Sequence, residues 1–205
     1  MARYTGPKVK VSRRFGTNIY ENDKGDKALD KRPYPPGEHG RGRRRQPSEY
    51  SVQLAEKQKA KYIYGLLEKQ FSNLYEEANR AKGITGETLL RFLELRLDNV
   101  VFRAGWASTR PQARQFVNHG LVQVNGKRVD IPSYRLRKGD VVTLGPRGKS
   151  MIVIRHNVET LDRIPPQWLD RAGSGDPQVT VRDLPLREQI DVPVREQLIV
   201  ELYSK

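Results

Sequence analysis

The sequence predicts an α+β fold in which a mainly helical part is interrupted by a small antiparallel sheet. Leucines recur every three or four residues between positions 90 and 97, which is the spacing of a buried helix face. Asn125-Gly126 stands between short alternating segments and is the strongest local signal of a two-residue hairpin turn. The apolar runs 141–144 and 151–154 indicate two further strands.

Residues 1–47 are predicted to form an extended basic arm. No apolar period runs through the segment, and the Pro- and Gly-rich stretch 33–45, PYPPGEHGRGRRR, disfavours a helix. Tyr34 and His39 stand among these prolines and glycines, and their rings could stack on exposed bases. A disordered basic tail is the alternative that composition alone leaves open.

Two helices are predicted next, over 48–70 with Ser48 as its cap and over 72–82. A third helix is expected over 87–101, with its charged residues on the solvent side of the apolar stripe. Thr109 and Gln112 then form a capping box for a fourth helix, which ends at His119-Gly120.

The remaining segments are expected to be short and partly irregular. Residues 145–150, GPRGKS, resemble the end of a phosphate-binding loop, but Thr143 occupies the place of the first glycine, so a hairpin turn is predicted. Residues 158–180 are expected to be a linker around Trp168. Residues 194–203 are expected to be a helix or a strand, with a helix favoured.

These elements suggest a helical domain with a smaller domain inserted into it. The expected divisions are a basic arm at 1–47, a helical domain at 48–90 plus 181–205, an inserted domain at 91–157 and a linker at 158–180. The inserted domain would consist of two helices packed on a short antiparallel sheet.

The charge of the chain is strongly basic and unevenly distributed. The 205 residues carry a formal net charge of +14, with a pI near 10.1. Residues 1–50 hold thirteen Lys/Arg against six Asp/Glu, and residues 91–157 hold thirteen against four. Because the excess is concentrated in one arm and one module, it favours a polyanionic partner, either nucleic acid or an acidic membrane surface.

The sequence contains no recognisable catalytic motif. Cysteine is absent, which excludes disulfides, thiolate catalysis and sulfur-ligated zinc. The three histidines lie in three separate segments, and no serine-hydrolase, zinc-protease or complete phosphate-loop motif occurs. No apolar run approaches the length of a membrane span. We therefore expect a protein of the cytoplasm that is not an enzyme, with no cofactor, no metal, no membrane contact and no homo-oligomer.

The candidate nucleic-acid contacts are basic residues of the arm, the first helix and the inserted module, together with a few polar or stacking side chains. For any single arginine, a solvated charge on a small α+β unit is the competing interpretation. The candidates are Arg41, Arg43, Arg44, Arg45, Lys57, Lys61, Arg103, Arg110, Arg114, His119, Asn125, Lys127, Arg128 and Tyr134.

Three long blocks resemble the uS4 family of bacterial small-subunit ribosomal proteins. They are residues 36–71 (PGEHGRGRRRQPSEYSVQLAEKQKAKYIYGLLEKQF), residues 96–134 (RLDNVVFRAGWASTRPQARQFVNHGLVQVNGKRVDIPSY) and the ending 197–205 (QLIVELYSK). The resemblance implies a helical domain with an inserted RNA-binding domain. It also implies direct binding of 16S rRNA, nucleation of small-subunit assembly, a part in translational accuracy beside uS5 and uS12, and, in some members, binding of the protein's own mRNA.

The chain departs from one feature of that family. Many bacterial members carry an N-terminal cysteine cluster that binds zinc, whereas Ser12, Arg13, Arg14 and Phe15 occupy the region where those ligands would begin. We therefore expect RNA to order the arm. Two alternatives remain open: an RNA-modifying enzyme with the same small module, and a factor that binds the ribosome transiently.

Overall fold

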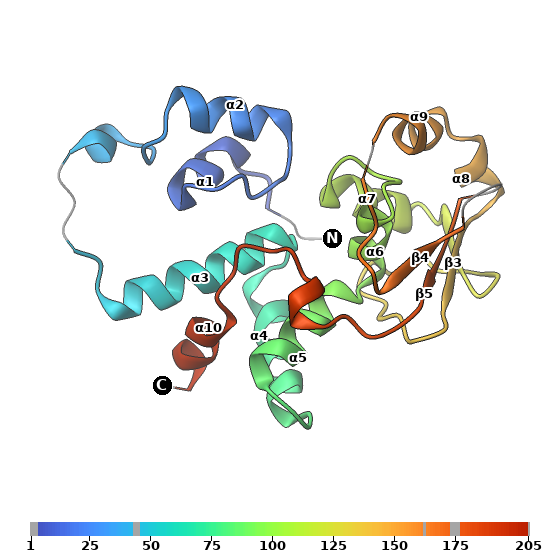
Figure 1. The fold of residues 1–205 in the computed structure, drawn as a ribbon. Helices are drawn as coiled ribbons and strands as arrows, with labels where there is room; N and C mark the ends of the chain where they lie inside the picture. The colour runs from blue at the N-terminus through green and yellow to red at the C-terminus, as the bar shows by residue number, and fades with distance from the viewer. Residues whose placement is uncertain (1–3, 43–45, 162, 173–176, 205) are drawn as a thin grey trace. The chain divides into compact units, whose positions relative to one another are not determined.

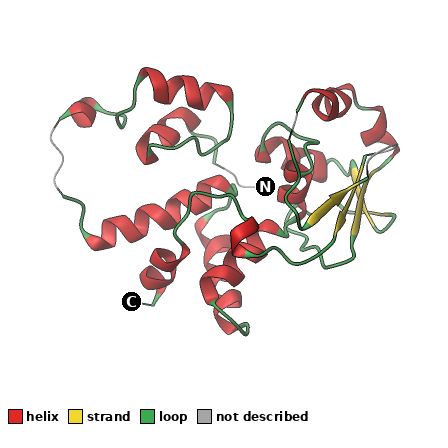
Figure 2. Ribbon diagram, in the orientation of Figure 1, coloured by secondary structure: helices red, strands yellow, loops and turns green. Residues whose placement is uncertain are grey.

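The computed structural model describes residues 4–42, 46–161, 163–172 and 177–204, and the chain forms two compact units (Figure 1). Unit 1 comprises residues 1–86 and 193–205, and unit 2 comprises residues 87–192. The described part of unit 1 is helical, and unit 2 holds a five-stranded sheet with helices (Figure 2). The predicted α+β class is confirmed.

Unit 1 is built from helices near both ends of the chain. Residues 194–203, for which a helix was favoured over a strand, do form one: α10 packs on α3, where Ile199 is fully buried and Gln53 donates to Glu201 Oε2 at 3.0 Å. The helices are α1 (Lys8–Phe15), α2 (Asp23–Lys31), the 3-10 helix η1 (Glu38–Arg41), α3 (Glu49–Ile63), α4 (Glu68–Arg80) and α10 (Glu196–Tyr203).

The extended conformation predicted for the basic arm is wrong at α1, at α2 and at the short 3-10 helix η1, which lies within the Pro- and Gly-rich stretch. Local capping explains α1 and α2: Gly16 adopts the left-handed conformation (φ 66°) that ends α1, and the Asn22 side chain accepts a hydrogen bond from Gly25 N at 2.7 Å at the start of α2. Val11 and Ile19 are buried between them. Two buried side chains are too few to produce the periodic pattern that sequence reasoning sought.

Unit 2 places its helices beside one antiparallel sheet of order β2-β1-β3-β5-β4 (Figure 1). The elements are α5 (Thr85–Glu94, whose first residues belong to unit 1), α6 (Leu97–Arg103), α7 (Arg110–Asn118), β1 (Val122–Val124), β2 (Lys127–Arg128), β3 (Val141–Leu144), α8 (Pro146–Ser150), α9 (Ile152–Thr160), β4 (Leu169–Arg171), β5 (Gln178–Val181) and the 3-10 helix η2 (Arg187–Gln189).

The single helix predicted over 87–101 is in fact two, α5 and α6. The chain between them is extended and pairs with a later segment: Leu136 N donates to Leu95 O at 2.9 Å, and Leu97 N donates to Tyr134 O at 2.8 Å. Leucines at helical spacing lie on both sides of the break, so the period alone could not reveal it.

The predicted hairpin and its neighbouring helix cap are confirmed. Asn125 (φ 50°) and Gly126 (φ 76°) both adopt positive φ, as the two central residues of a type I′ turn require. Thr109 Oγ1 accepts from Gln112 N at 3.4 Å, and the Gln112 side chain accepts from Ser108 N at 2.7 Å. Only residues 119–121 connect the end of α7 to the first strand of the β1–β2 hairpin.

Three expectations for the second half of unit 2 are corrected. Residues 145–150 contain the short helix α8 and not a hairpin turn, and residues 152–160 form helix α9 and not a strand at 151–154. The expected linker 158–180 supplies β4 and most of β5. Burial explains the last correction, since Val179 and Val181 are fully buried on β5, an inner strand between β3 and β4.

One apolar core joins α6, α7 and the sheet of unit 2. Its largest members are fully or almost fully buried: Phe102, Trp106 and Trp168 are each at most 1% exposed, and Phe116 is 4% exposed. Helix α9 adds Ile154, which is 1% exposed. The core fixes the helices against the hairpin and thereby sets where the hairpin's basic residues lie.

We predict that Phe116→Ala lowers the free energy of unfolding of unit 2 by about 3–5 kcal/mol, because it removes a buried aromatic ring and leaves a cavity. Both tryptophans of the chain lie in this core, so urea unfolding followed by tryptophan fluorescence reports on unit 2. The matched control is Ile152→Ala, at a side chain that is 81% exposed, which should change the stability by less than about 0.5 kcal/mol. Equal effects of the two substitutions would contradict the assignment of the core.

Candidate nucleic-acid interface

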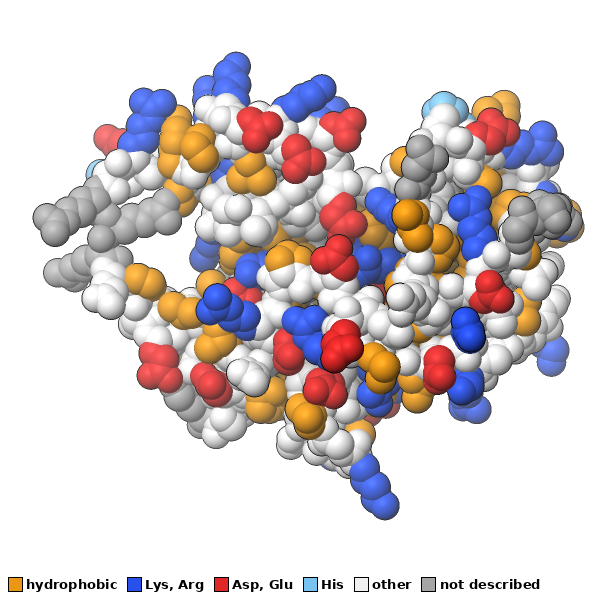
Figure 3. All heavy atoms as spheres, viewed as in Figure 1, with side chains coloured by type: hydrophobic (Ala, Val, Ile, Leu, Met, Phe, Trp, Pro, Cys, Tyr) orange, Lys and Arg blue, Asp and Glu red, His pale blue; other side chains and the backbone are white. Residues whose placement is uncertain are grey.

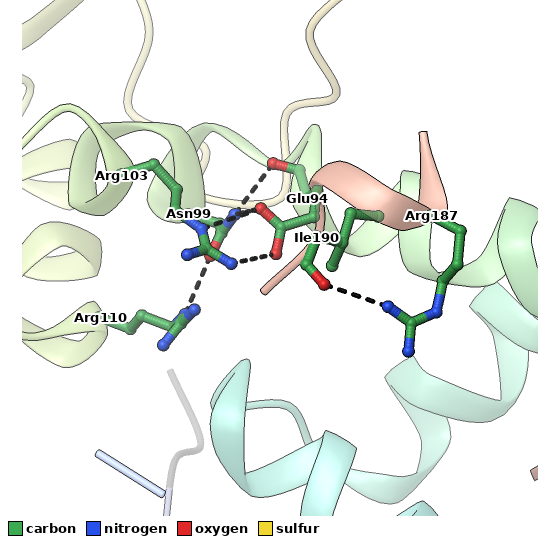
Figure 4. Close-up of polar contacts among 6 residues, drawn as sticks. All are labelled: Glu94, Asn99, Arg103, Arg110, Arg187 and Ile190. Atoms are coloured by element: carbon green, nitrogen blue, oxygen red, sulfur yellow. Dashed lines mark hydrogen bonds and ion pairs between the residues drawn. The ribbon is translucent and has the colours of Figure 1, made fainter. Parts of the chain in front are cut away.

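A buried carboxylate, Glu94, organises the polar contacts between α5, α6 and α7 (Figure 4). Its side chain is 1% exposed and accepts two hydrogen bonds from Arg103, Nη2 to Oε1 at 2.8 Å and Nε to Oε2 at 3.1 Å. Asn99 Nδ2 donates to Glu94 Oε2 at 2.8 Å and to the Glu94 carbonyl at 3.0 Å. A buried charge with this many donors is stabilised, whereas an unpaired one would be costly.

Asn99 carries the network on to α7. Its Oδ1 accepts from Arg110 Nε at 2.9 Å, and the Arg110 guanidinium lies 4.3 Å from the centroid of the Phe102 ring. Arg110 is only 7% exposed. The arginine at the start of α7 is thus held by a polar and an aromatic contact from α6.

A second set of ion pairs is centred on Asp98, the residue of α6 that precedes Asn99. Asp98 accepts two hydrogen bonds from Arg96, with Nη2 to Oδ2 at 2.7 Å, and Arg114 Nη1 lies 3.5 Å from the same oxygen. Burial lowers the pKa of Arg114, and the charge of Asp98 offsets part of that shift. Arg110 and Arg114, one turn apart on α7, are therefore engaged by consecutive residues of α6.

Three of the predicted RNA-binding residues are engaged in contacts within unit 2. Arg103 and Arg114 side chains are each 13% exposed, and Arg110 is buried, so all three hold unit 2 together. Their direct contact with RNA stays a prediction. Glu94 and Asp98, which were expected on the solvent side of a helix, are buried, and arginines compensate their charges.

The β1–β2 hairpin presents charge to solvent. Lys127 and Arg128 are exposed on the edge strand of the sheet. Asn125, another predicted contact, braces the turn through its amide: Nδ2 donates to Asp140 Oδ1 at 2.9 Å, and Oδ1 accepts from Val141 N at 2.9 Å. These hydrogen bonds fix the turn and thereby the backbone from which the Lys127 and Arg128 side chains extend.

Arg128 also meets the end of α7. A Cβ at Gly120 would lie 2.1 Å from Arg128 Nε, so only glycine leaves room for the guanidinium there, and Gly120 has a φ of 65° besides. A cation near the carboxyl end of a helix is favoured by the helix dipole. His119, the residue before this glycine, is exposed at the end of α7.

Tyr134 is 39% exposed and lies in the segment that pairs with the α5–α6 connection. Its position is set by its own backbone, because its carbonyl accepts from Leu97 N and its N–H donates to Ile131 O at 3.0 Å. The backbone of Tyr134 is therefore fixed, and its contact with RNA stays a prediction.

In unit 1 the structure describes only part of the predicted arm site. Arg41 is exposed, its guanidinium lies 4.7 Å from the centroid of the Tyr34 ring, and Nη2 donates to the Tyr34 hydroxyl at 2.9 Å. The predictions for Arg43, Arg44 and Arg45 lie outside the described residues.

The predicted contacts Lys57 and Lys61 on α3 are both paired with Glu68 at the start of α4. Lys57 Nζ lies 2.5 Å from Oε1, and Lys61 Nζ lies 3.0 Å from Oε2. Partial burial raises the pKa of Glu68, but the hydrogen bonds from the two lysines outweigh burial, so the pKa lies below its usual value. The two lysines join α3 to α4, and their binding to RNA stays a prediction.

Over the described residues, no helix is long and apolar enough to cross a membrane, and no three His, Cys, Asp or Glu side chains come together as a metal site would need. On the face seen in Figure 3, basic side chains project along the edge over α2, with acidic side chains among them.

The sequence did not reveal that Glu94, Asp98 and Asn99 are the partners of the arginines in unit 2. Tyr34, the partner of Arg41, was expected only to stack on a base. One signal was available for the first three. They interrupt the apolar run 89–102 together with Arg96, and Arg103 follows it directly; charges of both signs in such a run indicate buried pairs.

Comparison with known proteins covers the whole chain. Residues 3–94 match the family model described as the ribosomal protein S4/S9 N-terminal domain, and residues 95–142 match the S4 domain. The chain is 55% identical over 209 aligned positions to small ribosomal subunit protein uS4 of Cutibacterium acnes, and 54% identical over 206 to that of a Nocardioides species. It is 50% identical over 214 positions to the uS4 protein of Desulfitobacterium hafniense, and each comparison covers 100% of both chains.

We predict that Glu94→Gln lowers the free energy of unfolding of unit 2 by about 3 kcal/mol, because it leaves the Arg103 guanidinium without its buried counter-charge. Tryptophan fluorescence during urea unfolding measures the loss. The same substitution at exposed Glu159 of α9 is the control, with an expected change below about 0.5 kcal/mol. A Glu94→Gln protein as stable as the control would show that the network contributes nothing.

The Glu68 pair predicts an acid-dependent stability of unit 1. A carboxyl group whose folded-state pKa is depressed stabilises the fold above its unfolded pKa, here about 4.5, and this contribution is lost as the pH falls through the folded pKa. Wild type should therefore melt above Glu68→Gln at pH 6, and the difference should shrink towards zero at pH 3. Thermal melts followed by far-ultraviolet circular dichroism measure it. A difference that is constant, or larger at pH 3, would contradict the sign.

Proposed function

The chain belongs to the uS4 family of small-subunit ribosomal proteins, and from that premise we infer that it is a structural constituent of the bacterial small ribosomal subunit that binds 16S rRNA. The observation that carries this inference is identity of 50–55% over the full length of both chains. Bacterial ribosomes work in the cytoplasm, which is therefore where the chain acts.

The exposed basic residues support direct contact with the RNA backbone. Lys127 and Arg128 lie on a braced hairpin, and Arg41 lies on the arm. Cations on phosphates release condensed counterions, so affinity should fall steeply with salt. We propose that Arg43, Arg44 and Arg45 extend the same contact, on the strength of their charge and their position next to Arg41.

Specificity should come from shape. The deep major groove of an RNA duplex hides the base edges from side chains, so a protein distinguishes one folded RNA from another by where its phosphates and unpaired bases lie. The paired arginines of α6 and α7 support this view, since they fix the scaffold on which the hairpin and Tyr134 are carried. Arg103, Arg110 and Arg114 then serve binding mainly by holding that scaffold.

The finer roles are proposals drawn from the resemblance in residues 36–71 and 96–134. We propose that the chain nucleates assembly of the subunit body, contributes to translational accuracy, and has uS5 and uS12 as neighbours, and that it could also bind mRNA. We further propose that it acts as a scaffold and not through a reaction. What supports this is that the buried acids of unit 2 pair with arginines of neighbouring helices, Glu94 with Arg103 and Asp98 with Arg114.

An RNA-modifying enzyme and a transient ribosome-associated factor are separated from this proposal by one experiment. The chain is incubated with 16S transcripts and with small-subunit precursors that lack it, and the particles are washed in high salt on sucrose gradients. A constituent remains in the particle and leaves the RNA chemically unchanged. An enzyme would alter the mass of the RNA nucleosides, and a transient factor would be washed off.

We predict that replacing Lys127 and Arg128 together by alanine weakens binding to a 16S transcript and lowers the slope of log affinity against log salt by about two, one for each phosphate contact. Filter binding over a salt series measures both quantities. Arg182→Ala, at an exposed arginine that follows β5, is the control and should leave the slope unchanged. An unchanged slope in the double variant would remove the hairpin from the interface.

A further inference from the structure

Arg13 in the last turn of α1 binds the backbone of a segment about twenty residues later. Its Nε donates to Arg32 O at 3.2 Å and to Tyr34 O at 3.1 Å, and its Nη2 donates to Pro35 O at 3.3 Å. The side chain is half-buried. One guanidinium therefore ties the end of α2 and the following loop to α1.

This loop can supply few backbone bonds of its own. Residues 33, 35 and 36 are prolines, which have no N–H to donate. The planar fork of an arginine can reach several carbonyls at once, whereas a lysine ammonium on a flexible stem cannot reproduce that geometry. The conformation of residues 32–35 thus depends on the Arg13 fork more than on the loop's own hydrogen bonds.

Tyr34 passes this constraint on to Arg41. The Arg13 guanidinium lies 5.0 Å from the centroid of the Tyr34 ring and the Arg41 guanidinium 4.7 Å from it, and Arg41 also donates to the ring's hydroxyl at 2.9 Å. The loop closes tightly between the two arginines, because a Cβ on Gly40 would lie 2.1 Å from Pro35 O, a carbonyl that Arg13 also binds.

The arrangement suits an anion. Two guanidiniums near one ring repel each other, and three carbonyl oxygens offset this repulsion for Arg13. Arg41 is exposed, and the Tyr34 hydroxyl takes one of its five donors. A phosphate on the remaining donors would relieve the repulsion and could be bound in two-point fashion.

We propose that Arg13, Tyr34 and Arg41 form a clasp, in which Arg13 is a positioning residue that holds Arg41, through the Tyr34 ring, ready for a phosphate of ribosomal RNA. This rests on the proposed function. It adds a residue that does not itself need to touch the RNA, and it gives the ring of Tyr34 an intramolecular role in place of base stacking.

The test measures binding of the full chain to a 16S transcript and to an unrelated transcript of equal length over a salt series. The variants are Arg13→Lys, Tyr34→Leu, Arg41→Ala and the double variant Arg13→Lys with Arg41→Ala. Arg14→Lys is the matched control, since Arg14 is an exposed neighbour on the same helix that keeps its charge in the same way. Circular dichroism melts establish that each variant is folded.

Arg13→Lys keeps the net charge, yet the clasp predicts binding about five- to tenfold weaker and a salt slope lower by about one, as though a phosphate contact had been removed. Tyr34→Leu should give the same loss, and the double variant should bind no worse than Arg41→Ala alone. Arg14→Lys should bind as wild type does.

Three results bear on the clasp differently. A wild-type slope in Arg13→Lys, or losses from Arg13→Lys and Arg41→Ala that add, would overturn it, because a merely structural arginine would lower the melting temperature without removing a phosphate contact. If Arg13→Lys unfolds at too low a temperature for binding to be measured, the salt slope of Tyr34→Leu decides instead, because this variant breaks the contact between Arg13 and Arg41 at the ring. Wild type that binds both transcripts equally would instead defeat the proposed function.

Discussion

The orientation of α6 against α7 depends on buried charge that is fully paired. Glu94 is 1% exposed at its side chain, and an uncompensated carboxylate at such a site would cost several kcal/mol. Arg103 and Asn99 satisfy it, Asn99 then holds Arg110, and Asp98 holds Arg96 and approaches Arg114. Apolar packing brings the helices together, but these directional contacts fix how they are turned.

This constraint divides the basic residues into two groups. Arginines on α6 and α7 neutralise buried acids and so define a rigid scaffold. In unit 1, Lys57 and Lys61 pair with the half-exposed Glu68 and join α3 to α4. The residues that remain exposed, such as Lys127 and Arg128, lie on elements that the scaffold positions. Net charge alone therefore overstates how much of the surface is available to RNA. A binding protein for one folded RNA needs both groups, because phosphates must be met at fixed distances.

Much of the fold was predictable where a local rule decides the structure. Asn125-Gly126 requires a type I′ turn, Ser48 and Thr109 cap the helices that follow them, and the apolar stripe of α5 and α6 is buried. Prediction failed where the structure of a segment depends on contacts with residues far away in the sequence. The break at residues 95 and 96 exists because residues 134–136 pair there, and the apolar residues of α9 form a helix although they favour a strand.

The candidate site shows the same division. Exposure of Lys127, Arg128 and Tyr134 agrees with what the hairpin pattern suggested, whereas no pattern in the sequence could show that Arg110 bonds to Asn99, or that Arg13 reaches residues 32–35. Hydrogen exchange of the chain, free and bound to a 16S transcript, shows whether the buried ion pairs order α6 and α7 without RNA. Amides of α6 and α7 should already be protected in the free protein, and RNA should add protection at residues 34–41 and 125–128. Amides of α6 and α7 that exchange freely until RNA is added would contradict a scaffold set by its own buried charges.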